Sequence, residues 1–279
     1  MEKKILEVTV FADGLDHPEC VAVHPDGSVW AGGEAGQVYQ ISADGKQIKE
    51  VANTGGFNLG IAFSPLADWL AICDNKNKCV WKYDLLTGVL TCFSSAVEGV
   101  PMSIPNYPAF DRKGNLYVSD SGTFRKVNGR VYKFDIYGNG VVWHKGPFSF
   151  ANGMALSVDQ QVLYVVCTWL PGVEQIKILP DGSAGERSVL IEIPKTCPDG
   201  IALDEEGNKY ISCYTPNTIY KLNSAGELST FIHDWESHTL CNPTNIAFGG
   251  KDKKRLYVAG LGRWHIALID TDTPGLSLY

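Results

Sequence analysis

The sequence predicts an all-β protein folded as a six-bladed β-propeller with four strands in each blade. Three observations support this fold: a repeat that recurs six times, short apolar strands separated by hairpin turns, and a high glycine content. Each repeat contains an apolar strand, a turn that is usually rich in Asp and Gly, and a second apolar strand. The repeats cover residues 18–32, 58–73, 105–120, 151–167, 198–213 and 243–260. Self-similarity at this period, with several short strands per repeat, is typical of propellers.

Two further strands complete each blade. A third strand follows each pair, as at residues 37–41 and 130–134, and a fourth precedes the next repeat, as at residues 48–51 and 228–232. Turn sequences such as Asp-Gly and Glu-Gly-Asn between apolar runs are hairpin signals. The 29 glycines fit this, because tight turns need positive φ angles. We find no amphipathic helical period, so all-α and α/β folds are set aside.

The last repeat lacks a fourth strand of its own. It reaches only its third strand, at residues 264–269, whereas residues 5–11 have the pattern of an outer strand without a blade. We therefore expect the N-terminal strand to close the last blade, so that residues 1–279 form a single propeller domain.

Composition excludes several functional classes. The net charge of −7 argues against nucleic-acid binding and membrane-surface binding, both of which need a positive field. No apolar run reaches 18 residues, and the N-terminus does not have the pattern of a secretory signal. The eight cysteines contain no C-x-x-C pair, so we expect mostly reduced, buried thiols and a cytoplasmic protein.

One column of the aligned repeats carries polar side chains where first strands begin near the propeller axis. These six residues, called the ring positions here, are Glu19, Leu59, Asn106, Asn152, Asp199 and Thr244. Two carboxylates near one axis repel each other and lose hydration, and both effects cost free energy unless a cation compensates the charges. We therefore expect one bound divalent ion. Ca²⁺ is the preferred candidate, and Mg²⁺, Mn²⁺ or Zn²⁺ are alternatives. The competing interpretation is that these side chains only cap strand ends.

The repeats resemble the senescence marker protein / gluconolactonase / luciferin-regenerating enzyme family over nearly the whole chain. The motifs that carry the resemblance are PE at 18–19, NGMAL at 152–156, PDGIALD at 198–204 and NIAFGG at 245–250. The resemblance implies a six-bladed propeller with an axial metal held by Glu19, Asn152 and Asp199. It also implies lactone hydrolysis, with Asn106 facing the substrate and Asp199 as the general base. Two histidines are alternative bases: His17, two residues before Glu19, and His238, in the long loop before the sixth blade.

Two departures from the family pattern bear on the substrate. Ile104 and Tyr107 stand where sugar-lactone members commonly carry Arg and Asp. We therefore expect a lactone or related ester that is less polar than gluconolactone. Residues 18–22 also resemble strictosidine-synthase-like propellers, so lyase or synthase chemistry is one alternative, and a non-catalytic metal-binding scaffold is another.

Loops around the metal-bearing face supply the expected substrate contacts. Besides Asn106, we expect the small-molecule substrate to meet Tyr107, His17, Phe124, Trp169 and Tyr214. An aromatic, weakly charged mouth suits an apolar ligand. The loop at residues 119–129, which contains Phe124, is either a lid or a solvated hairpin tip. The sequence leaves the oligomeric state open.

Overall fold

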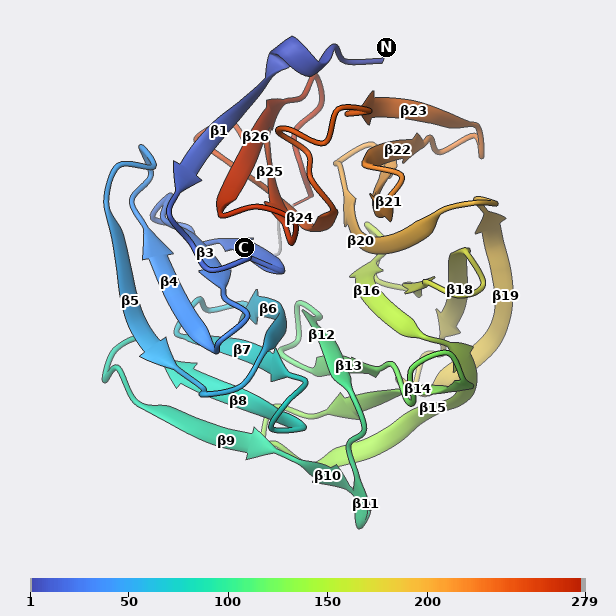
Figure 1. Cartoon of the computed structure of the whole chain (residues 1–279). Coiled ribbons are helices and arrows are strands. Elements are labelled where there is room, and N and C mark those ends of the chain that lie inside the picture. The colour runs from blue at the N-terminus through green and yellow to red at the C-terminus, as the bar shows by residue number, and fades with distance from the viewer. Residues whose placement is uncertain (1, 277–279) are drawn as a thin grey trace.

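The computed structural model describes residues 2–276 and confirms the six-bladed propeller (Figure 1). Six four-stranded antiparallel sheets stand around a central axis, and the first strands of neighbouring blades contact one another. None of the helical segments within the described residues is long and apolar enough to cross a membrane.

Each blade is a meander that runs outwards from the axis. The innermost strands are β2 (Cys20–Val23), β6 (Asn58–Phe63), β12 (Pro105–Phe110), β16 (Ala151–Leu156), β20 (Cys197–Leu203) and β24 (Pro243–Gly249). The second strands are β3 (Val29–Gly32), β7 (Trp69–Asp74), β13 (Leu116–Asp120), β17 (Val162–Cys167), β21 (Lys209–Thr215) and β25 (Arg255–Gly260). The third strands are β4 (Gln37–Ile41), β8 (Cys79–Asp84), β14 (Val127–Phe134), β18 (Gly172–Ile178), β22 (Thr218–Leu222) and β26 (His265–Asp270). The outer strands are β5 (Ile48–Asn53), β9 (Leu90–Ser94), β15 (Gly140–Ser149), β19 (Ala184–Glu192), β23 (Leu228–His233) and β1 (Val8–Asp13).

The N-terminal strand closes the ring as expected. β1 pairs antiparallel with β26, from Val8 opposite Ile269 to Asp13 opposite His265. Its start differs from the expected residue 5, because Ile5–Glu7 forms a 3₁₀ turn, η1. The Glu7 carboxylate accepts a hydrogen bond from the Lys4 backbone N–H at 2.7 Å, which stabilises this turn. A two-stranded hairpin, β10 (Ala96–Val97) and β11 (Val100–Pro101), was not anticipated and lies between blades two and three.

Neighbouring blades pack through large side chains. Trp69 of blade two meets Phe110 of blade three edge-to-face, with ring centroids 5.0 Å apart. Phe248 of blade six packs in the same way against Tyr210 of blade five, at 5.2 Å. Such aromatic pairs add to the free energy gained from burial. The blades thus form a rigid frame for the residues at the axis.

Glycines that follow two ring positions allow the inner strands to come close together. A Cβ at Gly153 would lie 2.6 Å from the Asp199 carbonyl oxygen, and one at Gly200 would lie 2.6 Å from the Thr244 carbonyl oxygen. No side chain fits at either distance. The motifs Asn152-Gly153 and Asp199-Gly200 therefore pair a polar ring side chain with a backbone that permits close approach.

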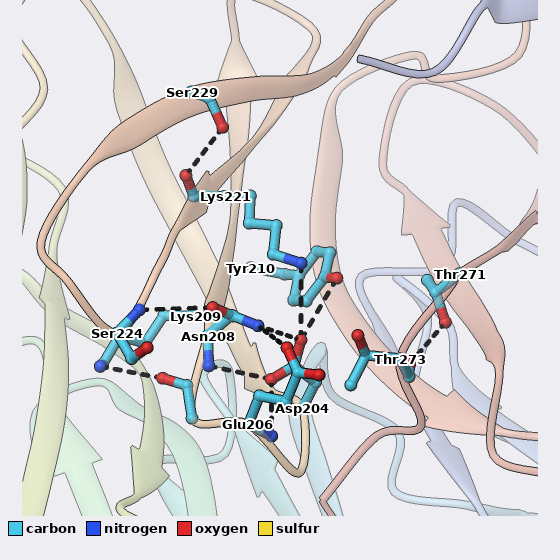
Figure 2. Close-up of polar contacts among 11 residues, drawn as sticks. Asp204, Glu206, Asn208, Lys209, Tyr210, Lys221, Ser224, Ser229, Thr271 and Thr273 are labelled. Carbon is cyan, nitrogen blue, oxygen red and sulfur yellow. Dashed lines mark hydrogen bonds and ion pairs between the residues drawn. The ribbon is translucent and has the colours of Figure 1, made fainter. Parts of the chain in front are cut away.

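The two ends of the channel carry different connections. We call the end where chains enter the first strands the upper face, and the end with the turns between first and second strands the lower face. On the lower face, Asp204 is fully buried between Asn208 and Lys221, whose Nζ lies 3.6 Å from the carboxylate (Figure 2). The C-terminal segment crosses this face, since the Leu276 N–H donates to the Leu203 carbonyl and the Gly275 N–H to the Lys253 carbonyl.

Candidate metal centre and substrate mouth

Irregular pairing marks the ring positions on the inner strands. In β16, Ala151 pairs with Cys167 but the next pair is Met154 with Val165, so Asn152 falls in a bulge. The registers of β12 and β20 shift in the same way around Asn106 and Asp199. A bulge redirects a side chain that regular alternation would place elsewhere.

The two ring amides are oriented by their neighbours. Asn152 Nδ2 lies 3.2 Å from both Thr168 Oγ1 and Asp199 Oδ2 and donates to each. Asn106 Nδ2 donates to Ser121 Oγ at 3.0 Å. These bonds fix the orientation of both amides and use only their nitrogens, so the amide oxygens can still accept.

The two ring carboxylates are buried and incompletely satisfied. Glu19 is 8% exposed and Asp199 is 4% exposed. Glu19 Oε2 and Asp199 Oδ1 have no hydrogen-bond partner within the described residues. Burial raises the pKa of Glu19 well above its usual range, and the charges of Asp199 and Glu34 raise it further. Burial also raises the pKa of Asp199, and the hydrogen bond from Asn152 offsets only part of this rise.

These donors fit a hard divalent cation. Unpaired buried carboxylate oxygens are costly, and a cation with oxygen ligands removes that cost. Among the described residues no three His, Cys, Asp or Glu side chains cluster as a metal site. A metal here would therefore depend on amide oxygens in addition to the two carboxylates.

His17 lies on the loop that leads to Glu19. Its Nδ1 is 3.3 Å from Asp16 Oδ1 and 3.5 Å from Glu34 Oε2, and its ring lies 5.6 Å from that of Trp264. The backbone of His17 has φ +38°, which is uncommon for a non-glycine residue. These contacts hold the imidazole on the upper face.

An aromatic cluster forms another part of this face. The Phe124 ring lies 5.6 Å from Trp169 and 6.0 Å from Phe150, both edge-to-face. The Arg125 guanidinium lies over Phe124 and Trp169. Phe124 is 59% exposed, so part of this aromatic surface faces solvent. The loop at residues 121–126 thus packs against blade four rather than extending freely.

Tyr214 lies near the carboxylates. Burial raises the pKa of its phenol, contact with Cys197 raises it further, and the charges of Asp199 and Glu19 add to the effect. Two donors on upper-face turns, Trp169 Nε1 and Arg263 Nε, are buried without a partner among the described residues. Both are available to an acceptor on a ligand.

Tyr107 occupies a different place from the other expected substrate contacts. It follows Asn106 and lines a cavity that opens towards the lower face. Burial raises the pKa of its phenol. Its backbone N–H donates to Ser119 Oγ at 3.0 Å. The structure therefore groups His17, Phe124, Trp169 and Tyr214 on the upper face, and places Tyr107 below the ring.

Sequence reasoning missed Asn245. Its Nδ2 donates to the carbonyl oxygens of Glu19 at 3.0 Å and Leu59 at 3.2 Å, and its buried Oδ1 has no partner within residues 2–276. The signal was present, because the corresponding residue is Gly in three other repeats. An amide at that position adds a third unpaired oxygen close to the axis.

Comparison with known proteins places this site in a family. The model of the SMP-30/Gluconolactonase/LRE-like region matches residues 86–261, which is more than half of the chain. The chain belongs to this family. Regucalcin of Gallus gallus is 26% identical over 123 residues, which cover 42% of this chain and 40% of that protein. The aligned part thus spans well under two thirds of that relative.

Solved structures of SMP-30/gluconolactonase/LRE-like fold match nearly the whole chain. A gluconolactonase of Xanthomonas campestris superposes with a TM-score of 0.80 at 19% identity, covering 96% of this chain and 89% of that one. A calcium-binding regucalcin of Agrobacterium tumefaciens also gives a TM-score of 0.80, at 17% identity, covering 95% and 94%. At these identities the likeness establishes the fold.

Proposed function

We propose that this protein is a metal-dependent hydrolase that opens a lactone or related ester at the upper face. The observation that carries the proposal is a pair of buried carboxylate oxygens, Glu19 Oε2 and Asp199 Oδ1, for which the described residues supply no hydrogen-bond partner. Two findings support a lactone as the substrate class. One is the likeness in fold to a gluconolactonase, and the other is the membership of this chain in the SMP-30/Gluconolactonase/LRE-like family.

The proposed ligands of one divalent ion are Glu19, Asn152 and Asp199. Ca²⁺ is the preferred ion. A calcium-binding regucalcin among the structural relatives supports this choice. When bound, the cation polarises the ester carbonyl and lowers the pKa of water. The Asn152 hydrogen bond to Asp199 Oδ2 fixes the carboxylate, so that Oδ1 stays directed away from the protein amide.

Asp199 and Asn106 are the proposed catalytic residues. In the reaction, a water oxygen attacks the acyl carbon, the bond to the ring oxygen breaks, and the product is a hydroxy acid. Asp199 accepts the water proton and returns it to the ring oxygen as that oxygen leaves, because its carboxylate has an oxygen, Oδ1, that no described residue occupies. Asn106 uses one amide hydrogen on Ser121 and retains the other for the carbonyl oxygen of the substrate.

The mouth favours a substrate less polar than gluconolactone. Phe124, Phe150 and Trp169 present an aromatic wall, and the unpaired donors Trp169 Nε1 and Arg263 Nε are suited to one or two acceptors. His17 is held by two acidic side chains and lies beside Trp264. This position suits it to contact the substrate from the side of the mouth opposite the aromatic wall. His238 is 70% exposed and paired with Glu236, so we give it no role.

A panel of lactones tests this function. Rates are measured on aliphatic, aromatic and sugar lactones with chelator, and again after Ca²⁺, Mg²⁺, Mn²⁺ or Zn²⁺ is restored. We expect chelator-sensitive hydrolysis that is fastest on aliphatic or aromatic members. Metal binding without turnover on any lactone would instead favour the scaffold or the lyase/synthase alternative.

A further inference from the structure

A cavity occupies the lower half of the axial channel. Its volume is about 750 Å³, within the range of small-molecule sites, which is roughly 300–1,000 Å³. Tyr107, which follows ring position Asn106, contributes to its wall. The Glu19 and Asp199 side chains are absent from the cavity lining, so the cavity is separate from the proposed active site.

A ring of alanines keeps this part of the channel open. The residue three places after each ring position is alanine in all six repeats, and all six line the cavity: Ala22, Ala62, Ala109, Ala155, Ala202 and Ala247. A closed propeller could fill this space with larger side chains. Apolar residues such as Phe63, Leu203 and Phe248 complete the wall, so its inner part is apolar.

The outer part of the cavity is positively charged. Arg112, Lys251, Lys253 and Arg255 line it, and none of the four forms an ion pair with an acidic side chain in the described part of the chain. Asp26 is the acidic residue of this lining; its Oδ1 lies 2.9 Å from His24 Nδ1 and accepts hydrogen bonds from the Ser28 N–H and hydroxyl. This concentration of cations stands out in a chain whose net charge is −7.

We propose that this cavity binds a small amphipathic anion, a monocarboxylate with an aliphatic body of about ten carbons. The apolar body enters the alanine-lined channel, where it loses contact with water. The carboxylate remains at the mouth, because burying it without a partner is costly and no acidic side chain of residues 2–276 pairs with the four cations there. The site is independent of catalysis at the upper face.

Calorimetric titration with sodium decanoate tests the proposal, with decan-1-ol as the uncharged probe. We expect one decanoate per chain, with decanol binding at least tenfold more weakly. The rim variant Lys251→Glu/Lys253→Glu should weaken decanoate at least fivefold and reduce the salt dependence. Its matched control is Lys49→Glu/Lys145→Glu on outer strands β5 and β15, which makes the same change in net charge and should leave affinity unchanged.

A second variant tests the channel. Ala202→Phe fills the alanine ring and should abolish decanoate binding, whereas Asp199→Asn at the upper face should not change it. The proposal is overturned if decanoate does not bind at millimolar concentration, or if decanol binds equally well. Equal weakening by the rim variant and its control would also overturn it, and the rim variant keeps the test decisive if Ala202→Phe does not fold.

Discussion

Asn152 Nδ2 donates a hydrogen bond to Asp199 Oδ2 at 3.2 Å, which joins the inner strands of blades four and five. This contact orients the Asp199 carboxylate, whose Oδ1 has no partner in the part of the chain that the structure describes. Replacing Asn152 by Ala should weaken Ca²⁺ binding by about 10–100-fold, because an oxygen donor and the orienting contact are both lost. Calorimetric titration with Ca²⁺ measures the effect.

A matched control exists for this substitution. Asn139 donates to Asp135 at 2.8 Å on an exposed turn, so Asn139→Ala removes a similar amide–carboxylate contact far from the ring. Ca²⁺ affinity should not change in this variant. Equal affinities for Asn152→Ala and the unmodified protein would remove Asn152 from the proposed ligand set.

Ring closure by β1 makes a prediction about stability. Deleting residues 1–13 removes the strand paired with β26, together with the buried side chains of Val8 and Ala12. The loss of about 3 kcal/mol or more should lower the thermal midpoint by at least ~5 °C. Differential scanning calorimetry measures it, and deletion of residues 1–2 alone is the control. A 1–13 deletion with an unchanged midpoint would show that β1 does not seal the propeller.

The hydrogen bonds of Asp234 lead us to expect that the free energy of unfolding depends on pH. Its buried carboxylate accepts backbone N–H bonds from Glu236, His238, Thr239 and Leu240. Burial opposes ionisation, but these bonds outweigh it and hold the pKa of Asp234 below its usual value. A lowered folded-state pKa contributes stability above about pH 4 that is lost as the pH falls through the lowered value.

Asp234→Asn should therefore reduce the free energy of unfolding by about 1–3 kcal/mol at pH 7, and by less at pH 3. Urea denaturation at both pH values measures the difference. Asp44→Asn, on an exposed turn, is the control and should cost much less. A loss that is the same at both pH values would exclude carboxylate ionisation as its source.

The aromatic cluster predicts substrate preference. Phe124→Ala removes a ring that contacts both Trp169 and Phe150. For apolar lactones KM should rise about tenfold, because the substrate loses one aromatic contact of ~1.4 kcal/mol. For polar lactones KM should change little. Steady-state kinetics on both classes measures this, with exposed Tyr137→Ala as the control. An equal change for both classes would assign Phe124 to folding rather than to selectivity.

The repeat made the fold and the ring positions predictable from sequence. A period that places one residue per blade near the axis predicts Glu19, Asn106, Asn152 and Asp199 as ring positions. Side-chain direction at a bulge was not predictable in the same way, because it depends on pairing register. Tyr107 shows this: it adjoins Asn106 in sequence, yet it lines the lower cavity.

The lower cavity was missed for another reason. An alanine in a strand reads as an ordinary small apolar residue, and its meaning emerges only when six of them surround one axis. Asn245 departs from the Gly of three other repeats, but its role becomes visible only with the finding that its Oδ1 is buried and has no partner among the described residues. Both features depend on contacts between blades that lie far apart in the chain.

Metal content tests the central claim most directly. The unmodified protein and the Glu19→Gln/Asp199→Asn variant are dialysed against Ca²⁺, then against metal-free buffer, and their metal is measured by elemental analysis. The isosteric substitutions keep the shape of the ring and remove both charges. We expect about one ion per chain in the unmodified protein and almost none in the folded variant. Equal metal content in the two proteins would contradict a metal centre at Glu19 and Asp199.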